Sequence, residues 1–306
     1  MSLIPLGILA ASAGSAVSFA GYFAGGYVGS WVATVDKFAF PSDSRTTLGT
    51  GLSAARNGLA GMSNSGVAGY AAGGGNGGGI TSTVDKFAFP SDSRTTLGTG
   101  LSSNRAQLGQ FSNSGVAGYA AGGQSTATVD KFAFSDDSRT TLATGLSNTN
   151  RLLTGFSNTG TAGYTAGGIT GSTQLSTVDK FAFPSDSRST LATGLSNSVQ
   201  SPCGMSNSGV AGYVAGGFSG SRPTTVDKFA FPSDSRSTLA TGLSEQRNDA
   251  SGMSDTGVAG YFGGGNDGTN LSSVDKFAFP SDVRSVLGTG LSAATVGMAG
   301  FQNEAL

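Results

Sequence analysis

The chain has 306 residues, of which 51 are glycine and only 11% are charged, and its formal net charge at pH 7 is −1. Its 17 basic residues do not exceed its 18 acidic ones, so no basic surface is expected and nucleic-acid binding is excluded. The absence of histidine and the single cysteine, Cys203, exclude an intrachain disulfide and remove the usual parts of zinc and nucleophilic sites. We therefore expect no cofactor, no metal and no catalytic residue, and predict that the chain is not an enzyme.

The first 17 residues form an apolar arm. No Lys or Arg precedes its apolar run, which is shorter than the roughly 20 residues of a membrane-spanning helix, so we expect neither a signal peptide nor a membrane span. Apolar side chains of this size do not stay in water, so the arm either fills a central channel or docks on a partner. We favour docking, with the anchor residues Leu3, Ile4, Leu6, Ile8 and Leu9.

After the arm, one stretch of sequence recurs six times. Its core, Val-Asp-Lys-Phe-Ala-Phe, places an aspartate at positions 36, 85, 130, 179, 227 and 275, at spacings of 49, 45, 49, 48 and 48 residues. A period near 48 residues indicates a repeat architecture, in which units too small to bury a core of their own stack into one domain. We assign this domain to residues 18–306.

Each period predicts four short antiparallel strands. In the second copy these are residues 57–63, 67–72, 83–89 and 94–97, separated by turns rich in Gly, Asn, Ser, Asp and Pro. Alternation in the third strand puts Phe87 and Phe89 on one face, and large residues recur opposite small ones, which suits sheets packed around a ring. The alternative, a β-solenoid, needs only about 20 to 30 residues per coil, so a 48-residue unit favours a propeller blade.

The ends of the chain complete one blade. The first copy of the second strand is residues 19–24, and the last copy of the first strand is residues 296–301. Pairing these two segments closes the ring without a free edge. The predicted fold is therefore all-β: a six-bladed β-propeller of four-stranded antiparallel blades, closed by its N-terminal and C-terminal strands.

The repeat resembles the kelch repeat. The likeness rests on a double glycine with a tyrosine upstream, on the Thr-Val-Asp-Lys-Phe strand, and on an arginine before the next first strand, and it covers about residues 18–303. These arginines are Arg56, Arg105, Arg151 and Arg247. The chain departs from kelch where leucines replace the tryptophan of the fourth strand, and where Val199 and Thr295 replace the arginine.

The repeated charges have two interpretations. The Asp36-Lys37 and Asp43/Arg45 sets could form rings of ligand-binding groups, but residues present in every blade are more simply explained by bonding between blades or within turns. The turn at residues 43–48 also partly resembles the Asp-box of sialidases, which keeps a sialidase-like glycoside hydrolase as a rival function.

The six copies differ mainly in two connections, which an up-and-down sheet places at the same end of each blade. These are the loop between the second and third strands and the segment between one blade and the next. A scaffold with one diversified face is typical of a binding module, although drift in loops gives the same pattern. The candidate binding residues on this face are Tyr27, Trp31, Arg56, Ile80, Phe218, Arg222, Arg247 and Leu271.

Residues 2–10 resemble the starts of virion structural proteins of marine bacteriophages. This resemblance implies a tail or capsid accessory located in the virion, with a secreted or cell-surface protein as the alternative. The expected partners are other virion or assembly subunits, bound through the arm, and a host-surface glycan or protein, bound through the variable loops. The rival to adhesion is a passive spacer or decoration protein.

Overall fold

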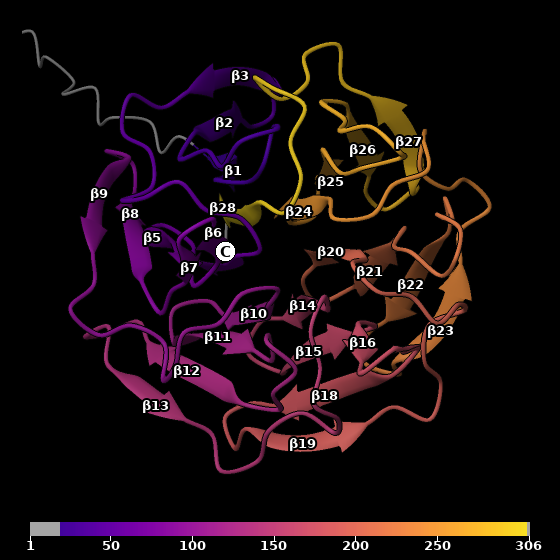
Figure 1. Cartoon of the computed structure of the whole chain (residues 1–306). Coiled ribbons are helices and arrows are strands. Elements are labelled where there is room, and N and C mark those ends of the chain that lie inside the picture. The colour runs from indigo at the N-terminus through magenta and orange to yellow at the C-terminus, as the bar shows by residue number, and fades with distance from the viewer. Residues whose placement is uncertain (1–18, 305–306) are drawn as a thin grey trace, which may run out of the picture.

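The computed structural model describes residues 19–304 and shows an all-β propeller in which six four-stranded antiparallel sheets surround a central axis (Figure 1). We number the blades in chain order, so that blade 1 contains β1 and blade 2 begins with β4. The innermost strands are β28 (Ala299–Asn303), β4 (Ala60–Asn64), β10 (Gly109–Asn113), β14 (Thr154–Asn158), β20 (Cys203–Asn207) and β24 (Ser251–Asp255). The second strands are β1 (Ala20–Ala24), β5 (Ala68–Ala72), β11 (Ala117–Ala121), β15 (Ala162–Ala166), β21 (Ala211–Ala215) and β25 (Ala259–Gly263).

The outer half of each blade is equally regular. The third strands are β2 (Val35–Ala39), β8 (Val84–Ala88), β12 (Val129–Ala133), β18 (Val178–Ala182), β22 (Val226–Ala230) and β26 (Val274–Ala278). The outermost strands are β3 (Ser44–Thr47), β9 (Ser93–Thr96), β13 (Arg139–Thr141), β19 (Ser187–Thr190), β23 (Ser235–Thr238) and β27 (Val283–Val286). Two short hairpins are β6 (Gly75–Asn76) with β7 (Gly79–Ile80), and β16 (Ile169–Thr170) with β17 (Thr173–Gln174).

The two ends of the chain close the ring, as predicted. β28 pairs antiparallel with β1, with Tyr22 opposite Phe301, and the two rings stack at a centroid distance of 5.1 Å. The predicted strand began at Val296, whereas β28 begins at Ala299. Val296 instead exchanges backbone hydrogen bonds with Tyr27, so the residues before the strand belong to a connection.

Neighbouring blades pack by placing a large side chain against a glycine. A Cβ atom on Gly69 would lie 2.0 Å from Cδ2 of Phe301, so the ring of Phe301 fits only over a glycine. Burying each phenylalanine or methionine in this way contributes roughly 1.5 to 3 kcal/mol to folding. The pairs around the ring are Met253 with Gly21, Phe301 with Gly69, Met62 with Gly118, Phe111 with Gly163, Phe156 with Gly212, and Met205 with Gly260.

A ring of ion pairs also joins the blades. The Asp92 carboxylate of blade 2 accepts hydrogen bonds from the Tyr22 hydroxyl at 2.7 Å and the Lys37 ammonium at 2.6 Å, both in blade 1. Burial, followed by the bond to Asp92, raises the pKa of Tyr22 above its ordinary value. The other five sets are Tyr70, Lys86 and Asp137; Tyr119, Lys131 and Asp186; Tyr164, Lys180 and Asp234; Tyr213, Lys228 and Asp282; and Tyr261, Lys276 and Asp43. These repeated charges therefore bond blade to blade.

The aspartate of each third strand holds the connector, by which we mean the segment that arrives from the preceding blade. Asp85 accepts hydrogen bonds from the backbone N–H and the hydroxyl of Ser53, both at 2.9 Å, and from the Thr96 hydroxyl at 2.7 Å. Burial alone would raise the pKa of Asp85, but these bonds and the nearby Arg56 outweigh it and leave the pKa below its ordinary value. The connectors are residues 48–59, 97–108, 142–153, 191–202, 239–250 and 287–298.

The disc has two different ends. The connectors lie at one end with the loops between second and third strands, as shown by the backbone bond from Asn57 N to Gly75 O at 2.9 Å. We call this end the variable face. The Asn-Ser-Gly and Pro-Ser-Asp-Ser turns lie at the other end, the constant face. The predicted arm at residues 1–17, with its anchor residues Leu3, Ile4, Leu6, Ile8 and Leu9, lies outside the described residues.

Candidate binding face

The six connectors meet at the axis in a closed ring of backbone hydrogen bonds. One residue of each connector has a φ between 53° and 69°, and its N–H donates to the carbonyl oxygen of the equivalent residue in the preceding blade at 2.7 to 3.0 Å. We call these residues the axial ring. Its members, in order around the axis, are Gly297, Gly58, Gln107, Leu152, Ser201 and Asp249.

The axial ring holds non-glycine residues in a strained conformation. A left-handed backbone costs of the order of 1 kcal/mol or more for a residue with a side chain. Four such residues, Gln107, Leu152, Ser201 and Asp249, adopt it here. Glycine, found at the other two positions, would avoid this cost. The side chains are therefore kept at an energetic penalty, which is common where a side chain has a function.

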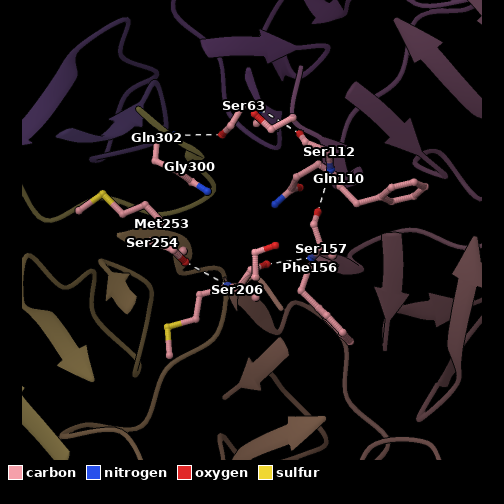
Figure 2. A pocket seen from close by; sticks show the side chains of 18 of the residues that line it. Ser63, Gln110, Ser112, Phe156, Ser157, Ser206, Met253, Ser254, Gly300 and Gln302 are labelled. Carbon is pink, nitrogen blue, oxygen red and sulfur yellow. Dashed lines mark hydrogen bonds between the residues drawn. The ribbon is translucent and has the colours of Figure 1, made fainter. Parts of the chain in front are cut away.

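A cavity of about 280 Å³ opens at the axial ring on the variable face, lined by all six ring residues and their neighbours. Gln110 lines this cavity and also a smaller chamber of about 60 Å³ at the constant face, so its side chain stands where the two chambers meet. Figure 2 shows the Gln110 side chain pointing toward the axis. The other blades have glycine at the equivalent position, namely Gly61, Gly155, Gly204, Gly252 and Gly300.

Asp249 contributes a carboxyl group to the cavity wall. Its Oδ2 accepts a hydrogen bond from Nδ2 of Asn248 at 2.5 Å, and Arg222 in turn donates to Oδ1 of Asn248 at 2.7 Å and to Oδ1 of Asn266 at 3.1 Å. Burial raises the pKa of Asp249, against the opposing effects of hydrogen bonds from Ser201 and Asn248 and of the positive charge of Arg222. A chain of polar groups thus runs from the cavity out to the loops.

Aromatic residues lie at two places around the cavity. The indole of Trp31 is 40% exposed, packs edge-on to Tyr27 at 5.5 Å, and donates from Nε1 to Oδ1 of Asn57 at 3.3 Å. Asn57 itself lines the cavity. In the loop that carries Arg222, the guanidinium lies 5.4 Å above the ring of Phe218. These contacts give the variable face both flat apolar surfaces and hydrogen-bonding groups.

The structure separates the candidate residues into two groups. Trp31 and Ile80 are exposed, while Tyr27, Phe218, Arg222 and Leu271 are partly exposed, all on the variable face. Arg56 and Arg247, also expected on the binding face, are buried, with exposures of 1% and 0%. They are not available to a ligand.

The buried arginines hold the connectors in place. Arg56 donates to the carbonyl oxygen of Gly73 at 2.8 Å and to Oδ2 of Asp85 at 2.9 Å. Arg247 donates to the carbonyl oxygen of Gly264 at 2.9 Å and lies 3.5 Å from Asp275. Because these partners are strand ends and third-strand aspartates, the arginines have a structural role.

The kelch-like assignment of Arg151 is also corrected. The residue that takes the place of Arg56 in blade 4 is Asn150, which donates from Nδ2 to the carbonyl oxygen of Gly167 at 2.8 Å. Arg151 lies one residue further along and contacts Oε1 of Gln107 at 3.4 Å. The arginine set of the connectors is therefore Arg56, Arg105 and Arg247.

At the constant face, the mouth of the central axis shows the same hydrogen bond in most blades. Backbone amides of the innermost strands donate to serine hydroxyls of the neighbouring blade at 2.8 to 3.0 Å (Figure 2). The hydroxyls belong to Ser63, Ser112, Ser157, Ser206 and Ser254, and Gln302 takes the sixth position. Glu304 departs from this pattern near the same mouth, where burial raises its pKa to about 7.

Sequence reasoning missed the residues that line the axial cavity. The candidate binding residues did not include Asp249, Gln107, Gln110 or Gln200. Asp249, Gln107 and Gln200 lie one or two residues after the connector arginine or its substitute, where the six copies vary, and this variation was the available signal.

No protein-family model and no curated protein sequence matches the chain. Within residues 19–304 there is no helix long and apolar enough to cross a membrane.

Proposed function

We propose that the chain is a non-enzymatic binding module that recognises a surface glycan or protein through its variable face. The observation that carries this proposal is the difference between the two axial mouths. At the constant mouth, five of six equivalent positions carry serine, and the hydroxyls bond to neighbouring backbone. At the variable mouth, equivalent positions carry glycine, glutamine, leucine, serine and aspartate around a cavity. Varied side chains on a rigid scaffold are typical of binding sites.

We also propose that this module is a tail or capsid accessory of a virion, rather than a secreted or cell-surface protein. The resemblance of residues 2–10 to the starts of marine phage virion proteins supports this location. The apolar residues 1–17 suit attachment to another subunit, which would leave the variable face pointing outward. Mass spectrometry of purified virions tests the location directly, and absence of the chain from the particles would contradict it.

The binding proposal is tested by adsorption of the purified, labelled chain to a panel of bacterial cells and to a glycan array. Trp31→Ala and Phe218→Ala remove flat contact surface from the variable face, so we expect each to weaken binding at least 10-fold. Val116→Ala is the control, because Val116 is 52% exposed on the constant face. It should bind like the wild type.

The rival functions give different results in the same assay. A passive spacer predicts that the folded wild type binds neither cells nor glycans. A sialidase-like hydrolase predicts release of sugar from the array or from a fluorogenic sialoside. Either result would replace the binding proposal.

A further inference from the structure

Four amide side chains with free hydrogen-bonding capacity converge on the axial cavity. Asn57, Gln107, Gln110 and Gln200 all line it and are all partly exposed. The side-chain oxygen of Asn57 accepts from Trp31, and that of Gln107 accepts from Arg151 at 3.4 Å. Among residues 19–304, none of the four amide nitrogens donates a hydrogen bond. Each is therefore available to a ligand.

The ionisable groups of the cavity limit the kind of ligand. Among the described residues that line it, Asp249 is the only ionisable one. A carboxylate offers about four acceptor positions, of which Asn248 and Ser201 use part. A phosphate, sulfate or carboxylate ligand would find no cation among these lining residues to bind its charge. A neutral ligand with several hydroxyl groups matches one carboxylate acceptor and four amide donors.

Apolar side chains line much of the remaining wall, beside the hydroxyl groups of Thr154, Ser201 and Ser251. Leu59, Leu108, Leu152, Val296 and Met298 line the cavity between its polar groups. A pyranose ring likewise has separate polar and apolar parts, because its hydroxyl groups lie at the edge and its C–H groups form flatter apolar faces. Trp31, bonded to the lining residue Asn57, borders the mouth where a second sugar of a chain would lie.

The axial ring is asymmetric. Its neighbours Gly297 and Gly58 contribute no side chains of their own, on the side next to the loop that carries Tyr27 and Trp31. The volume of about 280 Å³ lies near the lower end of small-molecule pockets, which span about 300 to 1,000 Å³. A single sugar residue, rather than an extended chain, suits this size.

We propose that the axial cavity binds one neutral sugar residue of a surface glycan, with Asp249 accepting hydrogen bonds from its hydroxyls and Gln107, Gln110 and Gln200 donating to them. This inference rests on the proposed binding function and assigns it a site and a ligand class. It also accounts for the strained side chains of the axial ring, since these are the groups that would contact the sugar.

The test is calorimetric titration of the full chain with methyl glycosides of glucose, galactose, mannose and N-acetylglucosamine, with sialyllactose and heparin as acidic probes. We expect at least one neutral glycoside to bind and the acidic probes to bind at least 10-fold more weakly. Asp249→Asn keeps the shape and tolerates the left-handed backbone, as asparagine does. It should weaken neutral-sugar binding at least 10-fold.

A second variant adds a side chain at the glycine positions of the axial ring. Gly297→Leu places leucine where blade 4 already has Leu152 in the same conformation, although its Cβ would lie a tight 3.2 Å from the amide nitrogen of Gly58. It should abolish sugar binding. Asp255→Asn is the matched control, because it makes the same chemical change at the constant face and restores the residue found in the other blades. Thermal melts show whether each variant is folded. If Gly297→Leu does not fold, the result for Asp249→Asn alone decides the test.

The possible results separate this inference from the function on which it rests. Binding of acidic probes alone, or neutral-sugar binding that both variants leave unchanged, would overturn the cavity site and leave surface binding intact. Adsorption to cells without affinity for any sugar would also overturn it. Failure of the wild type to adsorb to any cell or glycan would overturn the proposed function as well.

Discussion

Arg105 illustrates how a buried charge is stabilised in a connector. Its guanidinium donates to the carbonyl oxygens of Gly122 at 2.6 Å and Thr128 at 3.0 Å, and to Oδ2 of Asp130 at 2.5 Å. Burial lowers the pKa of Arg105, while Asp130 raises it. Removing one partner of such a pair leaves the other charge buried and uncompensated, which typically costs about 3 to 5 kcal/mol.

We therefore expect Arg105→Leu to reduce the free energy of unfolding by about 3 kcal/mol or more. Arg151→Leu is the matched control, because Arg151 is partly exposed and makes only a long contact to Gln107. Urea denaturation of both variants measures the difference. An equal loss for the two arginines would show that the corrected assignment of the connector arginines is wrong.

The turn between the third and outermost strands is the element that joins one blade to the next. In blade 3 this turn contains two adjacent aspartates with different surroundings. Asp137 accepts hydrogen bonds from Tyr70 at 2.8 Å and Lys86 at 2.6 Å of the preceding blade. Asp136 is exposed and accepts hydrogen bonds only from Ser138 in its own turn. The position of a carboxylate within the turn therefore decides whether it holds two blades together.

Asp137→Ala should lower the free energy of unfolding by about 2 kcal/mol or more, because hydrogen bonds to charged groups contribute about 1.5 to 3 kcal/mol each. Asp136→Ala should leave the unfolding midpoint nearly unchanged. Thermal and urea melts compare the two variants, which have the same amino-acid composition and differ only in the position of the change. If Asp136→Ala were the more destabilising variant, the turn would not act through contacts between blades.

Most strands were predictable, because six copies of one pattern show where apolar alternation stops and turn residues begin. The start of the innermost strand was not. The prediction began the strand of blade 2 at Asn57, whereas β4 begins at Ala60, because Asn57 and Gly58 bond to a loop and to the axial ring. The positive φ of Gln107 and Leu152 has no local sequence signal, since neither residue type favours it. The bonds that select it come from residues about one repeat away.

At the scale of the whole molecule, the ring is closed by a blade that both chain ends build. In blade 2, three residues separate β4 from β5. Joining Glu304 to Phe19 through one inserted glycine would give the same three-residue spacing between β28 and β1. Every blade would then have the same connection between its first and second strands. The chain termini could therefore be moved to another such turn without loss of a strand.

We expect a permuted chain that begins at Gly66, passes through this new turn and ends at Ser65 to fold with a melting temperature close to that of the wild type. The reason is that every strand pair and every contact between blades is preserved. Circular dichroism and thermal melts check this outcome. A permuted chain that fails to fold would contradict the equivalence of the blades.

The two faces of the disc were predictable from where the copies vary, and so was the exposure of Trp31. The cavity was not, because its residues come from all six connectors and meet only when the ring is closed. The burial of Arg56 could not be predicted from the sequence either, because an arginine in a variable segment is expected to be exposed. Only the fold shows that its partner Asp85 lies beside it. Local patterns thus predicted the elements, and closure of the ring created the site.

The central claim is that ligands bind at the variable face, and directed immobilisation tests it most directly. The native thiol does not interfere, because Cys203 is buried and burial raises its pKa to about 12. Val116→Cys tethers the disc to a maleimide surface by its constant face, and Ser221→Cys tethers it by its variable face. We predict that discs tethered through residue 116 capture cells or glycans, and that capture falls at least 10-fold when the tether is at residue 221. Equal capture by the two surfaces, or stronger capture by discs tethered at residue 221, would contradict the claim.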